Sequence, residues 1–283
     1  MPLAQHGAQR ASSRPMRLTV LGLALALVAL GGMAANPTPA TAAAAAGMKV
    51  VVVVGPAGSS TSKYITSAKR YASQAREYGA NVVEIYSPNA TWSKVKTAAQ
   101  GANVLIYLGH GNGYPSPYGP FSALTKDGLG LNSSAGHGHN NVKYFGEYYI
   151  KTYINLAPNA VVILNRLCYA SGNSEWGARN PTKAVAIKRA DNFAAGFLRA
   201  NARAVFAEGI NSASYVLQGV FKSDRTMAEI FESAPSYSGS YDFKFKSVRT
   251  PGYSAWLDPY APSRYYRSVI GKLTLSAASV RGG

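Results

Sequence analysis

Cys168 is the only cysteine in the 283-residue chain, and it follows closely on an apolar run at residues 160–164. His110 likewise follows an apolar run, at residues 103–108. A cysteine attacks as the thiolate, and a neighbouring imidazole can accept its proton. Because the carboxyl ends of parallel strands meet at one edge of a sheet, the two side chains are expected to meet there as nucleophile and base.

A single cysteine also has a simpler interpretation, as a buried and unreactive core residue. One cysteine cannot form an internal disulfide, and in an exported chain an unpaired cysteine indicates intermolecular pairing or a reactive thiol. If the thiol is activated by an imidazole, we expect an alkylating reagent to label Cys168 at neutral pH faster than it labels glutathione.

The first 43 residues have the features of a secretory signal followed by a linker of small residues. Arg10, Arg14 and Arg17 precede an apolar stretch at residues 18–30, and alanine-rich sequence follows. The apolar stretch is short for a membrane span, which needs about 20 residues, although an uncleaved signal anchor is the alternative. The pattern predicts a secreted or cell-surface protein.

The chain is strongly basic, with a formal net charge of +17, which falls to +14 without the three arginines of the predicted signal. Such a charge favours adsorption to an anionic cell-wall polymer or membrane surface. The basic residues are spread along the chain, whereas a nucleic-acid-binding module usually clusters them. Solubility alone is an equally good explanation of the charge.

The segment from residue 48 to residue 108 predicts alternating strands and helices. Residues 48–54 (MKVVVVV), 81–86 and 103–108 are strand-like apolar runs, and residues 64–78 and 91–100 have helical periodicity. This β-α-β-α-β order is typical of a parallel sheet with helices on its faces.

A further strand and helix pattern continues to residue 233, so we expect one α/β domain at residues 48–233. The later elements are an irregular segment at 109–141, a helix at 144–153, a strand at 160–164, a helix at 184–200, a strand at 204–207 and helical sequence at 215–233. Residues 234–283 are rich in Tyr, Ser and Pro and are expected to form an extension packed on the domain, with a strand within residues 267–276.

The order strand, His, strand, Cys, helix, strand resembles the caspase–gingipain–clostripain group of cysteine peptidases, and the gingipain-like branch most closely. The resemblance lies in residues 107–111 (YLGHG), Cys168 with Ser171 and Gly172 behind it, and residues 194–209. It implies a three-layer caspase-like α/β fold, with a mostly parallel central sheet flanked by helices.

The same resemblance implies an activity: hydrolysis of protein or peptide substrates through an acyl-enzyme. Cys168 would be the nucleophile and His110 the base, and the backbone N–H groups of Gly111 and Cys168 would form the oxyanion hole. Backbone donors aimed at a developing oxyanion are typically worth a few kcal/mol. The cysteine segment departs from the family pattern, because one additional residue separates Cys168 from Ser171-Gly172.

Three residues are candidates for the substrate pocket: Asn165, Arg166 and Glu208. The family often has Asp, Glu or Gln two residues before the cysteine, whereas this chain has Arg166. Arg166 would favour an acidic substrate side chain and Glu208 a basic one. The two side chains could also pair with each other, and the sequence leaves these alternatives open.

We expect no metal, cofactor or nucleotide. Residues 55–63 (GPAGSSTSK) lack the G-K-[ST] ending that places a lysine on phosphates. His137 and His139 have no thiol or carboxylate beside them, as a zinc site would need, and Asp127 alone does not make a calcium loop. The alternative to a peptidase is a catalytically inactive exported protein of the same fold that binds anionic surface polymers.

Overall fold

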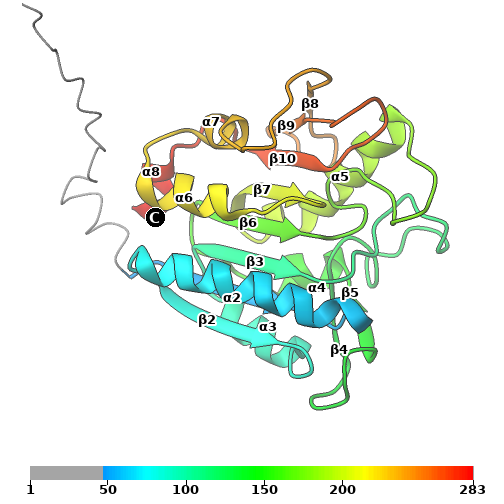
Figure 1. The fold of residues 1–283 in the computed structure, drawn as a ribbon, viewed down its shortest axis with the longest axis vertical. Coiled ribbons are helices and arrows are strands. Elements are labelled where there is room, and N and C mark those ends of the chain that lie inside the picture. Colours follow the sequence, from blue (N-terminus) through cyan, green and yellow to red (C-terminus); the bar gives the residue numbers. More distant parts are fainter. Residues whose placement is uncertain (1–46, 283) are drawn as a thin grey trace, which may run out of the picture. The chain divides into compact units, whose positions relative to one another are not determined.

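The computed structural model describes residues 47–282, and these form a single mixed α/β unit around one large sheet (Figure 1). The strand order is β2-β1-β3-β6-β7-β10-β9-β8. The first five of these strands run parallel to one another, and the last three are antiparallel. The eight strands are β1 (Lys49–Val54), β2 (Asn81–Tyr86), β3 (Val104–Leu108), β6 (Ala160–Asn165), β7 (Ala202–Glu208), β8 (Phe243–Lys246), β9 (Ser254–Leu257) and β10 (Arg267–Gly271).

The central strands are buried on both faces, which explains their continuous apolar sequence. In β1, Val51 and Val53 contribute to one hydrophobic core, whereas Val50, Val52 and Val54 contribute to the other. Side chains alternate between the two faces of a strand, so each apolar run supplies both cores at once.

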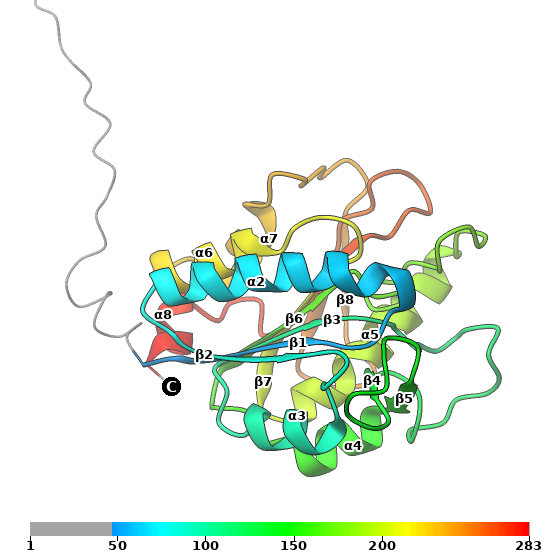
Figure 2. The same cartoon turned by 60° about the horizontal axis from the view of Figure 1, so that its bottom comes forward.

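Helices cover both faces of the sheet and make three layers, which Figure 2 shows with the sheet between them. One core contains residues of α2, α6, α7 and α8, and the other contains residues of α3, α4 and α5. The helices are α2 (Thr61–Glu77), α3 (Trp92–Ala99), α4 (Glu147–Tyr153), α5 (Lys183–Arg199), α6 (Ser214–Lys222), α7 (Met227–Glu232) and α8 (Ala277–Arg281), with a short 3₁₀ turn η1 (Gly58–Ser60). The predicted three-layer α/β architecture with a mostly parallel sheet is confirmed.

Local signals explain where several helices begin and end. Gly79 follows α2 with φ of +90°, a left-handed conformation that glycine adopts freely, and its N–H donates to the carbonyl of Arg76. Thr182 accepts a hydrogen bond from the Val185 N–H at the start of α5. Thr226 and Glu229 form a reciprocal capping box at the start of α7.

The expected helix at residues 144–153 is wrong at its beginning. β4 (Leu129–Asn132) and β5 (Val142–Phe145) pair as a small antiparallel sheet, so the helix begins only at Glu147. Phe145 stacks on Trp92 with the ring centroids 4.9 Å apart, and this packing holds the end of β5 against α3.

The segment after Ser233 supplies three of the eight strands. β10 pairs with β7 along its whole length, and β9 and β8 continue the sheet beyond it. The segment predicted as an extension is therefore built into the central sheet, and it buries residues such as Trp256 and Ile270.

The predicted signal and linker, residues 1–43, lie outside the described residues. Within residues 47–282, no helix has both the length and the apolar character that a membrane span requires.

Candidate active site

The sheet brings His110 and Cys168 to one edge. Strands β3 and β6 are parallel neighbours in which Leu108 pairs with Asn165, and His110 and Cys168 follow within three residues of these strand ends. Both side chains line the same cavity of about 460 Å³, with His110 exposed at its rim and Cys168 half-buried. The structure therefore brings together the two side chains that the sequence singles out.

Two glycines let the histidine loop, which follows β3 and carries His110, touch the cysteine loop, which follows β6 and carries Cys168. A Cβ at Gly111 would lie 2.0 Å from the carbonyl oxygen of Cys168, and one at Gly113 would lie 2.3 Å from the Cβ of Tyr169. Cβ atoms do not approach other atoms so closely, so any side chain at either position would force the two loops apart.

We predict that Gly111→Ala separates His110 from Cys168. The added Cβ displaces the Cys168 backbone, so we expect a loss of about 1–3 kcal/mol of unfolding free energy. We also expect kcat/KM for peptide hydrolysis to fall about 100-fold, since an error of about 1 Å in positioning has that effect. Urea denaturation and peptide-hydrolysis kinetics measure the two quantities.

Gly101→Ala is the matched control for that change. Gly101 precedes the first residue of β3, at the end of that strand away from His110. Its φ is +64°, and nothing lies within 4 Å of an added Cβ. This variant has backbone strain without a collision at the site. Equal kcat/KM values for the two variants would contradict the role assigned to the Gly111 contact.

Buried polar residues anchor the loop that follows His110. Asp127 is fully buried, and it accepts a hydrogen bond from the Tyr114 N–H (3.0 Å) while its own N–H donates to the Asn112 carbonyl (2.9 Å). The Lys126 ammonium donates to the Asn112 side chain and to the Tyr118 carbonyl, each at 2.9 Å. Burial raises the pKa of Asp127 to about 8. Asp127 thus anchors the loop that follows His110.

Arg189 joins the two loops, and the sequence gives no signal for this role. It projects from α5 and is buried, donating from Nε to the Pro115 carbonyl (2.7 Å) and from Nη1 to the Asn173 carbonyl (2.9 Å). Its guanidinium also lies 4.7 Å from the centre of the Tyr169 ring. One side chain therefore holds the histidine loop and the cysteine loop at a set separation.

Glu175 is a second site residue that the sequence does not single out, because it lies between the strand expected at residues 160–164 and the helix expected at residues 184–200. It lines the cavity together with His110 and Cys168. Its carboxylate accepts hydrogen bonds from the hydroxyls of Tyr118 (2.7 Å) and Tyr169 (2.9 Å). Glu175 thus places a fixed negative charge beside both candidate catalytic groups.

The local environment favours the neutral forms of both candidate catalytic groups. Burial, followed by the charge of Glu175, raises the pKa of Cys168 to about 11, although the Trp176 amide acts in the opposite direction. The pKa of His110 is lowered from its ordinary value, because partial burial by surrounding protein atoms outweighs the opposing effect of the Glu175 charge. These directions count against an activated thiol and against the expectation of fast alkylation, because a thiol with a raised pKa should be labelled more slowly than glutathione at neutral pH.

We predict that Glu175→Gln moves the pH midpoint of Cys168 alkylation to lower pH. Removing the carboxylate charge stabilises the thiolate, so at pH 8 iodoacetamide should react faster by roughly a few-fold. Glu232→Gln, at an exposed acid at the end of α7, is the control. An unchanged midpoint in Glu175→Gln would show that the carboxylate does not act on the thiol.

Arg166 reaches a second and larger cavity. Its backbone N–H donates to the Glu208 carbonyl (2.7 Å), and Arg166 lines a cavity of about 1030 Å³ that Cys168 and Glu175 also line. Of the three predicted pocket residues, Arg166 is the one that lines this cavity.

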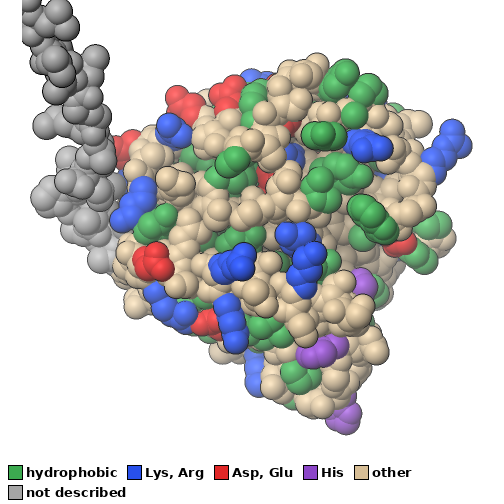
Figure 3. All heavy atoms as spheres, viewed as in Figure 1, with side chains coloured by type: hydrophobic (Ala, Val, Ile, Leu, Met, Phe, Trp, Pro, Cys, Tyr) green, Lys and Arg blue, Asp and Glu red, His purple; other side chains and the backbone are tan. Residues whose placement is uncertain are grey.

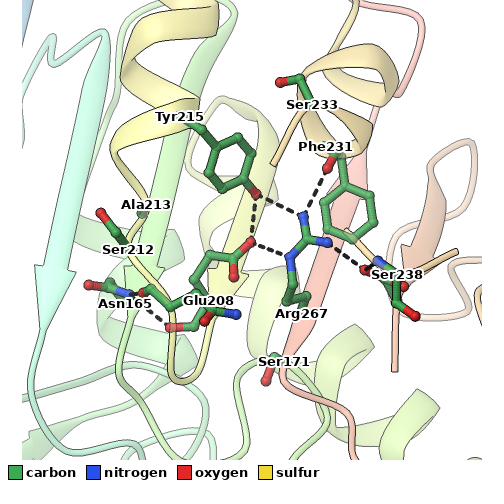
Figure 4. Close-up of polar contacts among 12 residues, drawn as sticks. Asn165, Ser171, Glu208, Ser212, Ala213, Tyr215, Phe231, Ser233, Ser238 and Arg267 are labelled. Atoms are coloured by element: carbon green, nitrogen blue, oxygen red, sulfur yellow. Dashed lines mark hydrogen bonds and ion pairs between the residues drawn. The ribbon is translucent and has the colours of Figure 1, made fainter. Parts of the chain in front are cut away.

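Glu208 and Asn165 do not line either cavity, contrary to the prediction. The Glu208 carboxylate is buried, where it accepts hydrogen bonds from Tyr215 (2.6 Å) and from Arg267 Nε (2.9 Å), as Figure 4 shows. Asn165 is buried as well, and its amide donates to the carbonyls of Glu208 and Asn211. Glu208 pairs with Arg267 rather than Arg166 because β10 lies beside β7, a pairing that the sequence does not reveal.

His137 and His139 lie on a separate loop. His137 is exposed, and His139 Nδ1 lies 2.9 Å from the Ser87 hydroxyl. Within residues 47–282, no three His, Cys, Asp or Glu side chains are grouped as a metal site would need. Lys and Arg side chains are spread over the face drawn in Figure 3 and do not form one patch there.

Comparisons with known proteins give a resemblance to solved structures. No protein family matches the chain, and no curated protein matches it. Among solved structures, it is similar to the Arg-specific cysteine proteinase gingipain R, with 14% identity and a TM-score of 0.33. The match covers 84% of this chain and 63% of the proteinase, so this chain spans less than two thirds of the proteinase's length.

Proposed function

We propose that the protein is a cysteine endopeptidase in which Cys168 is the nucleophile and His110 is the base. One observation carries the proposal: the two side chains follow neighbouring parallel strands and line a single cavity. The contact of Gly111 with the Cys168 backbone and the bridge through Arg189 support it, because both set the spacing of the two loops.

The pKa directions favour general-base catalysis over a preformed thiolate–imidazolium pair. The thiol is protonated at rest, so His110 accepts its proton as sulfur bonds to the substrate carbonyl carbon. The tetrahedral intermediate collapses when the imidazolium protonates the leaving amine, which releases the first peptide and leaves a thioester on Cys168. Water, deprotonated by His110, then hydrolyses the thioester and restores the thiol.

Two backbone amides support the oxyanion assignment. Within residues 47–282, neither the Gly111 nor the Cys168 N–H donates to a protein acceptor, so both are free for a ligand. A Cβ at Gly111 would be only 3.1 Å from the Cys168 nitrogen, so the two amides belong to backbone segments in direct contact. Donors already in place stabilise a developing negative charge without reorganisation.

We predict that the acid limb of kcat/KM lies below pH 6.5, the ordinary pKa of histidine. His110 must be unprotonated to act as the base, and its surroundings lower its pKa, so activity persists as pH falls through 6.5 and is lost only at lower pH. A pH–rate profile measures this limb. A limb above pH 6.5 would mean that another group, or a His110 with a raised pKa, controls the reaction.

We also propose that the protein is exported, which the arginines and apolar stretch of residues 1–43 support. A second function is then a non-catalytic protein that adsorbs to anionic surface polymers, favoured by the basic charge. Binding of that kind weakens with salt and survives the double change His110→Ala, Cys168→Ala.

A peptide library separates the two functions. The full chain is incubated with a defined library, and new termini are identified by mass spectrometry for wild type, His110→Ala and the control His137→Ala. We expect cleavage by wild type and His137→Ala, its loss in His110→Ala, and an acyl adduct on Cys168 after acid quenching. Absence of cleavage by wild type, or equal cleavage by His110→Ala, would refute the peptidase proposal.

A further inference from the structure

The larger cavity lies directly beside the candidate nucleophile. Its volume is about 1030 Å³, and its walls come from the start of α2, from residues 166–168 and 173–181 of the cysteine loop, from the loop after β7 and from the connection between β9 and β10. These segments lie at the edge of the sheet where the parallel strands end (Figure 1). A group held in this cavity would therefore lie next to a peptide bond presented to Cys168.

The charged groups of this cavity differ in whether they have partners. Arg267 and Asp258 pair with each other, and Glu175 accepts hydrogen bonds from two tyrosine hydroxyls. The other charged side chains of the wall are cations that form no ion pair within residues 47–282: Lys63, Arg166 and Arg264. The unpaired charge of the cavity wall is thus positive.

Arg166 is the best placed of these cations. It lies two residues before Cys168, and a backbone hydrogen bond to Glu208 fixes it at φ of +64°. Its Nε is buried and has no hydrogen-bond partner in the described part of the chain. A buried donor without an acceptor is costly, so an incoming acceptor is favoured there. A carboxylate matches the fork of donors on a guanidinium better than any other side chain.

The rim of the cavity indicates a peptide rather than a small free acid. Trp176, Ile210 and Tyr260 line the cavity from three different loops, and they are 92%, 41% and 68% exposed. Exposed apolar groups around a cavity are typical of surfaces that contact another chain. The cavity is also larger than one side chain needs.

We propose that this cavity binds an Asp or Glu side chain at the residue whose carbonyl Cys168 attacks, with Arg166 as the specificity-determining residue. The inference rests on the proposed peptidase function and adds its substrate class. Arg166 pairs with the substrate carboxylate, while Glu175 remains bound to its two tyrosines on the side shared with His110.

Peptides that differ only at the residue before the scissile bond test this proposal. The peptides carry Asp, Asn, Glu, Gln, Lys or Ala there, and kcat/KM is measured for wild type, Arg166→Gln, Arg166→Glu and Arg225→Gln. Arg225 is an exposed arginine whose carbonyl accepts from Ala277 beside α8, so it serves as a control outside the cavity.

We expect wild type and Arg225→Gln to prefer Asp over Asn by about 10- to 100-fold, the value of a hydrogen bond to a charged group. This ratio should fall to about one in Arg166→Gln, and Arg166→Glu should instead prefer Lys. A ratio is insensitive to the fraction of enzyme that folds. A wild-type preference for Lys, or an Asp/Asn ratio that Arg166→Gln leaves unchanged, would overturn the proposal while leaving the peptidase function intact.

Binding provides a readout that does not depend on catalysis. The Cys168→Ala variant is titrated with the Asp and Asn peptides, and binding is followed calorimetrically. Tighter binding of the Asp peptide supports the assignment of Arg166 even if no peptide is cleaved, in which case the peptidase function alone fails. Equal affinities would overturn the assignment.

Discussion

Cys168→Ala is expected to abolish peptide hydrolysis, with kcat at least about 10⁴-fold lower than in wild type. Removing the nucleophile of a covalent mechanism has effects of this size or larger, because the acyl-enzyme can no longer form. Continuous hydrolysis of a cleaved library peptide measures kcat. A residual rate within tenfold of wild type would eliminate Cys168 as the nucleophile.

The same variant should fold normally, which makes its loss of activity interpretable. Cys168 is half-buried beside a cavity, so replacing its sulfur leaves little new empty space inside the core. We expect the free energy of unfolding to change by about 1 kcal/mol or less. Since the described chain has no other cysteine, alkylation of wild type should reproduce the loss of activity seen in the variant.

Arg267→Met is expected to lower the free energy of unfolding by about 3–5 kcal/mol, the largest stability effect that we predict. Arg267 is buried and pairs with both Glu208 and Asp258. Figure 4 shows its contact with Glu208 and its hydrogen bond to the Phe231 carbonyl. Removing the cation leaves two buried carboxylates unpaired, which costs far more than the pair itself contributes. Urea denaturation at pH 7 measures the loss.

The loss in free energy of unfolding caused by Arg267→Met should be smaller at low pH. Burial raises the pKa of Glu208, and Arg267 opposes that rise, so the pKa is higher still without the cation. A carboxyl whose folded-state pKa lies above its unfolded value stabilises the fold at low pH and loses this contribution as pH rises through the folded pKa.

The control is Arg76→Met, which removes the exposed ion pair with Glu84 and should lower the free energy of unfolding by about 1 kcal/mol or less. Equal losses in the two variants would contradict the importance of burial.

Sequence patterns predicted the parallel half of the fold well, because its strands are buried on both faces. The valine run of β1 has no other reasonable interpretation, and Gly79 marks the end of α2 clearly. The antiparallel half was harder to predict. β8 reads FKFK, four residues of an edge strand, and such a short alternation is also common in loops. β5 was merged with the helix after it because aromatic residues occupy both.

The candidate site was predictable only as far as residues that follow strands. His110, Gly111 and Cys168 could be found because the carboxyl ends of neighbouring parallel strands converge. Arg189 and Glu175 lie on a helix and in a loop, and tertiary packing alone brings them to the site. Whether Arg166 or Glu208 faces the cavity depends on where β10 lies, and β10 pairs with β7 across nearly sixty residues of intervening chain.

The placement of β10 has a consequence for how this chain acquires its structure during synthesis. Until residues 254–271 emerge from the ribosome, β7 has an open edge of unpaired backbone groups, and Glu208 has no cation beside it. Open strand edges invite pairing with other chains. A nascent chain ending before β10 is therefore aggregation-prone, and a holding factor bound to the emerging chain should raise the yield of folded protein.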